Sequence, residues 1–126
     1  MTSELTRILY VEDDPDIQAI AMMVLETISG FTLEACSCGS DALAKAVQFK
    51  PDLVLLDVML PKLSGRDILI EIQNIAPNQP VVIMTAHTTI DQAEELMLLG
   101  AVDFLPQPFS AEHFRKLPGV VLALWR

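Results

Sequence analysis

Short apolar runs alternate with segments of helical period along this chain, and no other feature of the sequence restricts its fold as much. Most of these runs are free of polar residues, which is typical of strands buried on both faces of a sheet. Phe31–Cys36 is more polar and fits an edge strand. The strands predicted in this way are Ile8–Val11, Phe31–Cys36, Leu53–Leu56, Val81–Met84 and Ala101–Leu105.

Helical segments separate the predicted strands, and residues typical of helix ends flank them. Asp14 and Pro15 are a typical N-cap and first helical residue, and Gly30 is a typical end. Ser64 and Thr88 each stand three residues before an aspartate, a spacing that resembles a capping box. The predicted helices run from Pro15 to Gly30, Ser40 to Phe49, Ser64 to Ile75, Thr88 to Gly100, and onward from Ser110.

Five strands that alternate with five helices predict an α/β protein with a doubly wound parallel sheet. The flavodoxin-like strand order 2-1-3-4-5 suits a chain of 126 residues, which is the size of one domain. We therefore expect residues 1–126 to form a single domain. In such sheets the ligand site lies beyond the carboxyl ends of the strands, where the first and third strands are neighbours.

Acidic residues follow both of these central strands. Glu12 and Asp13 come directly after the first strand, Asp57 directly after the third, and Thr85 after the fourth. Carboxylates that share one crevice repel one another, and a hard divalent cation such as Mg²⁺ would neutralise them. A carboxylate beside Mg²⁺ can carry a phosphoryl group, to which a threonine hydroxyl can donate. Asp14, in contrast, is interpreted only as a helix cap.

Charge and hydropathy exclude several classes of function. The chain has 17 acidic and 8 basic side chains, and a net charge of -9 disfavours binding to nucleic acid or to an anionic membrane. Its longest apolar run, Ala19–Leu25, is far shorter than the roughly 20 residues of a membrane span. Met1–Glu4 does not resemble a signal peptide, and Cys36 and Cys38 lack companion ligands at zinc spacing. We therefore expect a cytoplasmic protein.

The order and spacing of several motifs resemble the receiver domains of two-component response regulators. The resemblance runs from Arg7 to about Leu117, and its motifs are specific in combination although each is weak alone. The matching segments are Val11–Asp14, Leu55–Gly65, Met84–Ala86, Asp103–Phe104 and Pro108–Phe109.

The resemblance implies a phosphoacceptor and a metal site. Asp57 would receive a phosphoryl group from a histidine kinase or a phosphotransfer protein. Asp13, Asp57 and the backbone carbonyl of Met59 would bind Mg²⁺ directly, and Glu12 would hold the ion through water. The domain would thus be a signalling module rather than an enzyme.

The resemblance also implies a switch. Thr85 would move toward the phosphoryl group and Phe104 would change rotamer in response. The face formed by the fourth helix, the fifth strand and the fifth helix would then bind a downstream protein, as a shift between two populated states.

One position departs from the family pattern, which usually has a lysine where this chain has Gln107. With Mg²⁺ and a lysine the site would be neutral, whereas with Gln107 one negative charge remains. Two readings stay open: phosphorylation with slower transfer or weaker coupling, or an adaptor that signals without phosphate. The resemblance further implies a cis bond before Pro108, which would orient Gln107.

Two other functions would suit the same fold. A phosphohydrolase that uses Asp57 as its nucleophile would normally carry a second aspartate where this chain has Met59. A flavin or nucleotide binder would carry a phosphate loop rich in glycine or hydroxyl residues where this chain has Glu12–Asp14. The sequence favours a receiver domain over both.

Overall fold

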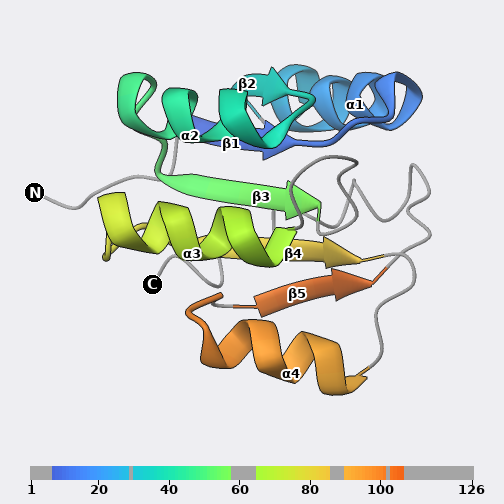
Figure 1. Cartoon of the computed structure of the whole chain (residues 1–126). Coiled ribbons are helices and arrows are strands. Elements are labelled where there is room, and N and C mark those ends of the chain that lie inside the picture. The colour runs from blue at the N-terminus through green and yellow to red at the C-terminus, as the bar shows by residue number, and fades with distance from the viewer. Residues whose placement is uncertain (1–6, 29, 58–64, 86–89, 102, 107–126) are drawn as a thin grey trace, which may run out of the picture.

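A single five-stranded parallel sheet organises the molecule. The computed structural model describes residues 7–28, 30–57, 65–85, 90–101 and 103–106. The strands are β1 (Arg7–Val11), β2 (Thr32–Cys36), β3 (Leu53–Asp57), β4 (Val81–Thr85) and β5 (Asp103–Pro106). They pair in the order β2-β1-β3-β4-β5, and all four pairings are parallel, so every strand ends at the same edge (Figure 1). The predicted fold class and strand order are confirmed.

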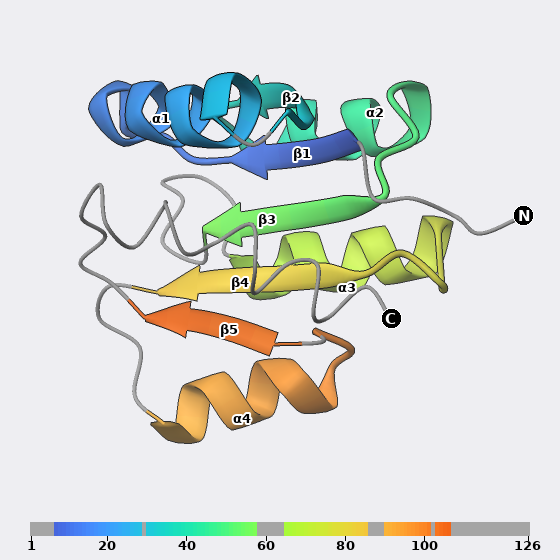
Figure 2. The ribbon, with the colours of Figure 1, turned by 180° about the vertical axis from the view of Figure 1, so that it is seen from behind.

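Helices cover both faces of this sheet. They are α1 (Pro15–Met22), which continues as the π-helix η1 (Met23–Ile28), then α2 (Gly39–Gln48), α3 (Gly65–Ile75) and α4 (Ile90–Leu98). Seen from behind, α1 lies in front of the sheet while α2 and α3 lie beyond it (Figure 2). Across the described part of the chain, no helix combines the length and apolarity that a membrane span requires. The predicted fifth helix, from Ser110 onward, lies outside the described residues.

The alternation of side chains along the strands divides the core in two. In β1, Ile8 and Tyr10 point to the face covered by α1, and Leu9 and Val11 point to the face covered by α2 and α3. All residues of β3 are buried, as expected of a central strand with helices on both faces. This burial fixes the register of β1 and β3, and therefore fixes which residues emerge at their carboxyl ends.

Several element boundaries differ from the prediction. The first helix continues as the π-helix η1. Ala21 and Leu25 are fully buried in one core cluster, and Ile17 packs against it. The second helix begins at Gly39, one residue before the predicted Ser40. Its N-cap is Cys38, whose backbone is extended. Residues from Asp103 onward, not from Ala101, pair with β4.

The later start of β5 has a local cause at the end of α4. Gly100, with φ of +123°, donates its N–H to Met97 O at 3.1 Å, and Ala101 donates to Leu96 O at 3.1 Å. These two bonds form a Schellman motif, in which the left-handed residue is usually glycine. Because Ala101 closes the helix, its N–H is not available to a strand.

Candidate functional site

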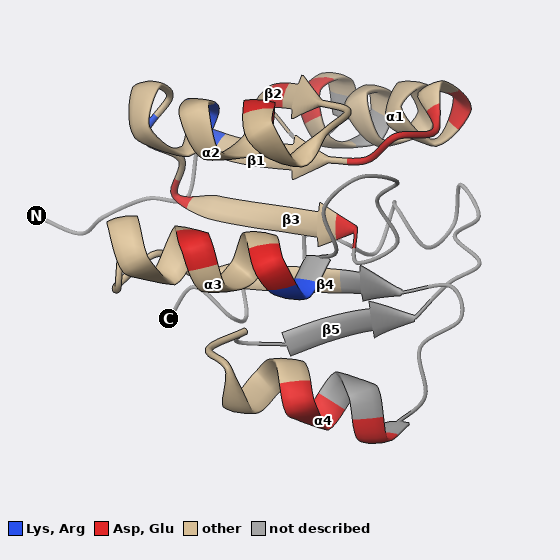
Figure 3. Cartoon of the chain, in the orientation of Figure 1, with Lys and Arg blue, Asp and Glu red and all other residues tan. Residues whose placement is uncertain are grey.

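The carboxyl ends of β1 and β3 bring three carboxyl groups together. Val11 pairs with Leu56 in the sheet, so Glu12 and Asp57 emerge side by side from neighbouring strands. One carboxylate oxygen each from Glu12, Asp13 and Asp57 lies within 4.8 Å of the others. Figure 3 shows the acidic segments after β1 and at the tip of β3 on the same edge of the sheet. The predicted convergence of these three residues is therefore present in the fold.

Two of the three carboxyl groups are buried. Glu12 is 1% exposed and Asp57 is 5% exposed, and they are the buried charged side chains within the described ranges. Asp13 is exposed. A buried carboxylate is costly unless hydrogen bonds or an opposite charge compensate for the water it has lost. The sheet thus holds two acids where they are unfavourable on their own, with a third at the opening to solvent.

The electrostatics of the site reflect this arrangement. Burial is the main cause that raises the pKa of Glu12 to about 9, and the neighbouring Asp57 and Asp13 contribute to this rise. Glu12 Oε1 is buried and has no hydrogen-bond partner among the described residues. Burial also raises the pKa of Tyr10, and the negative charges of Glu12 and Asp57 add to this increase. Among the described residues, therefore, no donor compensates the buried Glu12 oxygen.

Magnesium fits this donor set. It is a hard cation that prefers oxygen ligands and is usually held in proteins by one or two carboxylates, with water completing its shell. Three clustered carboxyl groups supply such ligands, and a cation would compensate the buried, unpartnered Glu12 oxygen. Receiver domains, the class that the sequence resembles, generally bind Mg²⁺ in an acidic pocket.

Helix α1 begins immediately beside this cluster, with Asp14 as its N-cap. Asp14 Oδ1 accepts from the N–H of Asp16 at 2.9 Å and from that of Ile17 at 3.4 Å. The predicted capping role of Asp14 is confirmed. Its carboxylate is occupied with the helix end, so it is distinct from the three clustered acids.

Sequence reasoning missed Gln18, one turn into α1. Its side-chain Nε2 donates to Glu12 O at 2.5 Å and to Cys36 O at 3.3 Å. The only signal in the sequence is its position four residues after the N-cap Asp14, where a side chain can turn back over the helix start.

Of the remaining predicted residues, two lie in β4 and β5 and three fall outside the described residues. Thr85 is the last residue of β4, opposite Pro106, and Phe104 lies in β5 opposite Ile83; the structure describes their backbone only. Met59, Gln107 and Pro108 fall outside the described residues. The proposed contributions of these five residues stay predictions.

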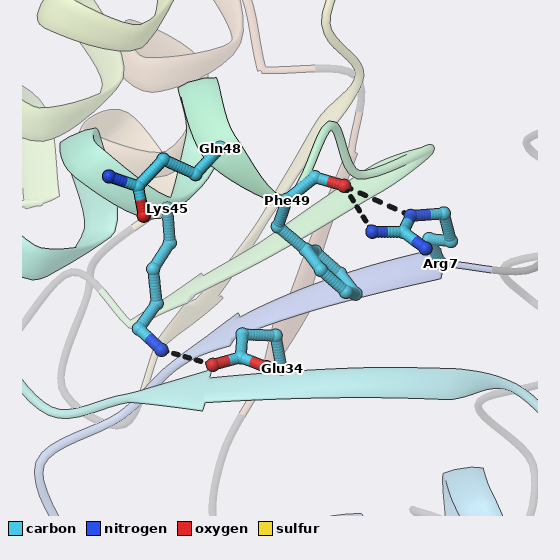
Figure 4. Close-up of a pocket in the computed structure, with 5 residues that line it drawn as sticks. All are labelled: Arg7, Glu34, Lys45, Gln48 and Phe49. Atoms are coloured by element: carbon cyan, nitrogen blue, oxygen red, sulfur yellow. Dashed lines mark hydrogen bonds and ion pairs between the residues drawn. The ribbon is translucent and has the colours of Figure 1, made fainter.

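Away from this cluster, a hollow of about 240 Å³ lies beside α2 and is lined by Arg7, Glu34, Lys45, Gln48 and Phe49 (Figure 4). Lys45 pairs with Glu34 there, and the Arg7 guanidinium lies 4.0 Å above the centre of the Phe49 ring. Its charged groups are matched by these partners. The hollow therefore shows none of the like-charge crowding found at the acidic cluster.

Known proteins resemble this chain over nearly all of its length. Residues 8–117 match the family described as the response regulator receiver domain. The "Probable C4-dicarboxylate response regulator DctR" of Halalkalibacterium halodurans is 31% identical over 112 residues, which are 88% of this chain and 49% of that protein. The regulatory protein LuxO of Vibrio cholerae is 37% identical over 105 residues, which are 83% of this chain and 23% of LuxO. The chain thus spans about half or less of these relatives.

A solved structure shows the same fold. The signal receiver domain of a LuxO repressor protein from Vibrio parahaemolyticus superposes with a TM-score of 0.84 at 32% identity, over 96% of this chain and 91% of that one. The strand order, the acidic cluster at the ends of β1 and β3, and the sequence match agree with one another. This chain belongs to the family of response regulator receiver domains of two-component signalling.

Proposed function

We propose that Asp57 is the phosphoacceptor of this receiver domain and takes its phosphoryl group from a histidine kinase or a phosphotransfer protein. The observation that carries the proposal is the cluster of Glu12, Asp13 and Asp57, with oxygens within 4.8 Å at the edge where β1 and β3 meet. In open α/β sheets this is the place where ligands bind. The sheet fixes the Asp57 backbone, because β3 is buried on both faces.

Asp13, Asp57 and the carbonyl of Met59 would hold Mg²⁺, with Glu12 acting through water. The ion would neutralise the clustered acids and lower the repulsion between them and an incoming phosphate. The high pKa of Glu12 supports this assignment, since burial and the neighbouring acids disfavour its ionised form, which a cation would stabilise. Asp13, the exposed member, would be the ligand most accessible to an ion from solvent.

The transfer itself requires only one nucleophile from this chain. A carboxylate oxygen of Asp57 attacks the phosphorus of the phosphohistidine as the phosphorus–nitrogen bond breaks, and the imidazole leaves with that electron pair. The product is an acyl phosphate on Asp57. Glu12 and Asp13 form no covalent bond in this step.

The output is a shift between two states of the domain. Thr85 is the last residue of β4 and Phe104 lies within the neighbouring strand β5; both would respond to the phosphoryl group. The face formed by α4, β5 and the predicted last helix would then bind a downstream protein. We propose that residues 1–126 act in this way as one domain whose role is signalling rather than catalysis.

Phosphorylation by a small donor tests the proposal. The protein is incubated with acetyl phosphate and Mg²⁺, and intact-mass spectrometry measures the addition of one phosphoryl group. Asp57→Asn keeps the shape of the side chain and is expected to abolish the product, as is removal of Mg²⁺ by a chelator. Asp41→Asn, at an exposed position on α2, is the matched control and should be phosphorylated as the wild type. Equal phosphorylation of Asp57→Asn and the wild type would refute the assignment.

Gln107 favours a second candidate, an adaptor that signals without phosphate. A glutamine amide forms neutral hydrogen bonds, which are roughly half as strong as those of a charged lysine. We expect Gln107→Lys to raise the yield or the lifetime of the phosphorylated state, measured by the same mass assay over time. If the wild type takes no phosphate but Gln107→Lys does, the adaptor is the better description. If both proteins phosphorylate and switch equally, Gln107 does not limit the site.

A further inference from the structure

The side chain of Gln18 joins three elements at the edge of the acidic cluster. It extends from α1, and its amide nitrogen donates to the carbonyl oxygens of Glu12 at 2.5 Å and of Cys36 at 3.3 Å. Glu12 follows β1 and Cys36 is the last residue of β2. One amide group therefore connects the helix to the ends of two adjacent strands.

Glu12 is the residue whose backbone this contact completes. Its N–H donates to Cys36 O at 3.0 Å, which continues the pairing of β1 with β2 by one residue. β1 ends at Val11, so the Glu12 carbonyl has left the sheet, and a buried carbonyl requires a donor. Gln18 supplies that donor. With both backbone groups of Glu12 bonded, the direction in which its side chain leaves the backbone is fixed.

Asp13 lies between this anchor and a second one. On its amino side, the Gln18 amide holds the carbonyl of Glu12. On its carboxyl side, Asp14 caps α1 and its carbonyl accepts from the backbone N–H of Gln18 at 3.0 Å. Gln18 thus contacts the chain on both sides of Asp13, once through its side chain and once through its backbone.

We propose that Gln18 is a positioning residue for the metal site: it holds the Glu12–Asp13 backbone so that these carboxyl groups converge with Asp57. This inference rests on the proposed function, because the ligand held by the converged groups is Mg²⁺. Residues that orient metal ligands without touching the metal typically change metal affinity by about tenfold or more when replaced. Among the described residues, the Gln18 amide donates to backbone carbonyls and not to a carboxylate, so its effect acts through the Glu12–Asp13 backbone.

Mg²⁺ affinity tests this assignment directly. Gln18→Met keeps the length of the side chain and removes the donor, and isothermal titration should show Mg²⁺ affinity about tenfold weaker. Gln18→Lys restores a donor and is expected to recover most of the affinity in high salt, which screens its added charge. Gln48→Met makes the same change at an exposed position of α2 and should bind Mg²⁺ as the wild type.

A second measurement requires no variant. In the wild type, the side-chain amide protons of Gln18 should exchange with solvent more slowly than those of the exposed Gln48, because both carbonyl contacts protect them. Exchange at the rate of Gln48, or unchanged Mg²⁺ affinity in a folded Gln18→Met, overturns the positioning role. A wild type that binds no Mg²⁺ would instead refute the proposed function, so the two failures are distinguishable.

Discussion

The two ends of the sheet differ in how their charged side chains are partnered. At the carboxyl end, Glu12, Asp13 and Asp57 crowd three acidic groups within 4.8 Å, two of them buried. At the amino end, Arg7 is the first residue of β1. Its Nε and Nη2 donate to Phe49 O at 3.0 and 2.5 Å, and its guanidinium stacks on the Phe49 ring.

The amino end is further secured by backbone contacts around Arg7. The N–H of Arg7 donates to Asp52 Oδ2 at 2.9 Å, and the N–H of Asp52 donates to Arg7 O at 2.8 Å. These bonds tie the first strand to the segment that leads from α2 into β3. Every polar group named here has a partner of suitable kind, which is the usual condition for groups removed from water.

The difference separates stability from function within one sheet. Partnered charges at the amino end stabilise the fold whether or not a ligand is present. Clustered acids at the carboxyl end destabilise the fold when they are ionised, and the proposed cation would relieve that repulsion. Substitutions at the carboxyl end should therefore change how the free energy of unfolding depends on pH and Mg²⁺. Substitutions at the amino end should lower that free energy without changing this dependence.

The largest expected effect is the pH dependence of stability at the carboxyl end. Folding raises the pKa of Glu12 from 4.5 to about 9, so the folded protein keeps a proton that the unfolded chain releases over this range. The free energy of unfolding should fall as pH rises from about 4.5 to about 9, by on the order of a few kcal/mol without metal. Urea denaturation at several pH values in a chelator measures it.

Saturating Mg²⁺ should reduce that fall, because it stabilises the ionised form, and its stabilising effect should grow with pH. Glu12→Gln removes the titrating group and should flatten the slope. Glu71→Gln, at an exposed position on α3, is the matched control and should keep the wild-type slope. A wild-type stability in chelator that rises with pH over this range would contradict the account of the carboxyl end.

How much of each end the sequence predicts depends on whether a feature follows from the order of the elements and from local spacing, or requires the exact direction of backbone groups in the folded chain. The strand order and the convergence of Glu12, Asp13 and Asp57 could be predicted, since apolar runs fix the strands and the topology brings their ends together. The contacts of Gln18 and Arg7 could not, because each reaches carbonyl groups whose direction only the folded backbone defines. The Asp14 cap, a purely local feature, was predicted correctly.

A smaller effect is expected from disrupting the amino end. Arg7→Met keeps an apolar stem but loses the hydrogen bonds to Phe49 O and the stacking on its ring, which should lower the free energy of unfolding by about 2 kcal/mol. Arg66→Met is the matched control, because Arg66 pairs with Glu95 where both are more than half exposed, and should cost under about 0.5 kcal/mol. Mg²⁺ affinity should be unchanged in both; a loss of affinity in Arg7→Met would show that the two ends are coupled.

The smallest expected effect is a gain, at a strained residue of the amino end. Lys50 has φ of +52°, a left-handed conformation that costs a residue with a Cβ about 1–2 kcal/mol, and it lies between Phe49 and Asp52, which Arg7 holds in place. Lys50→Gly should relieve that strain and stabilise the protein by about 0.5 kcal/mol, since the greater freedom of glycine in the unfolded chain offsets part of the gain.

Lys50→Ala removes the same charge but keeps the Cβ and should show no such gain. If alanine stabilises as much as glycine, the charge of Lys50 is responsible. If the gain from glycine persists in Arg7→Met, the strain is local to the turn rather than imposed by the Arg7 contacts.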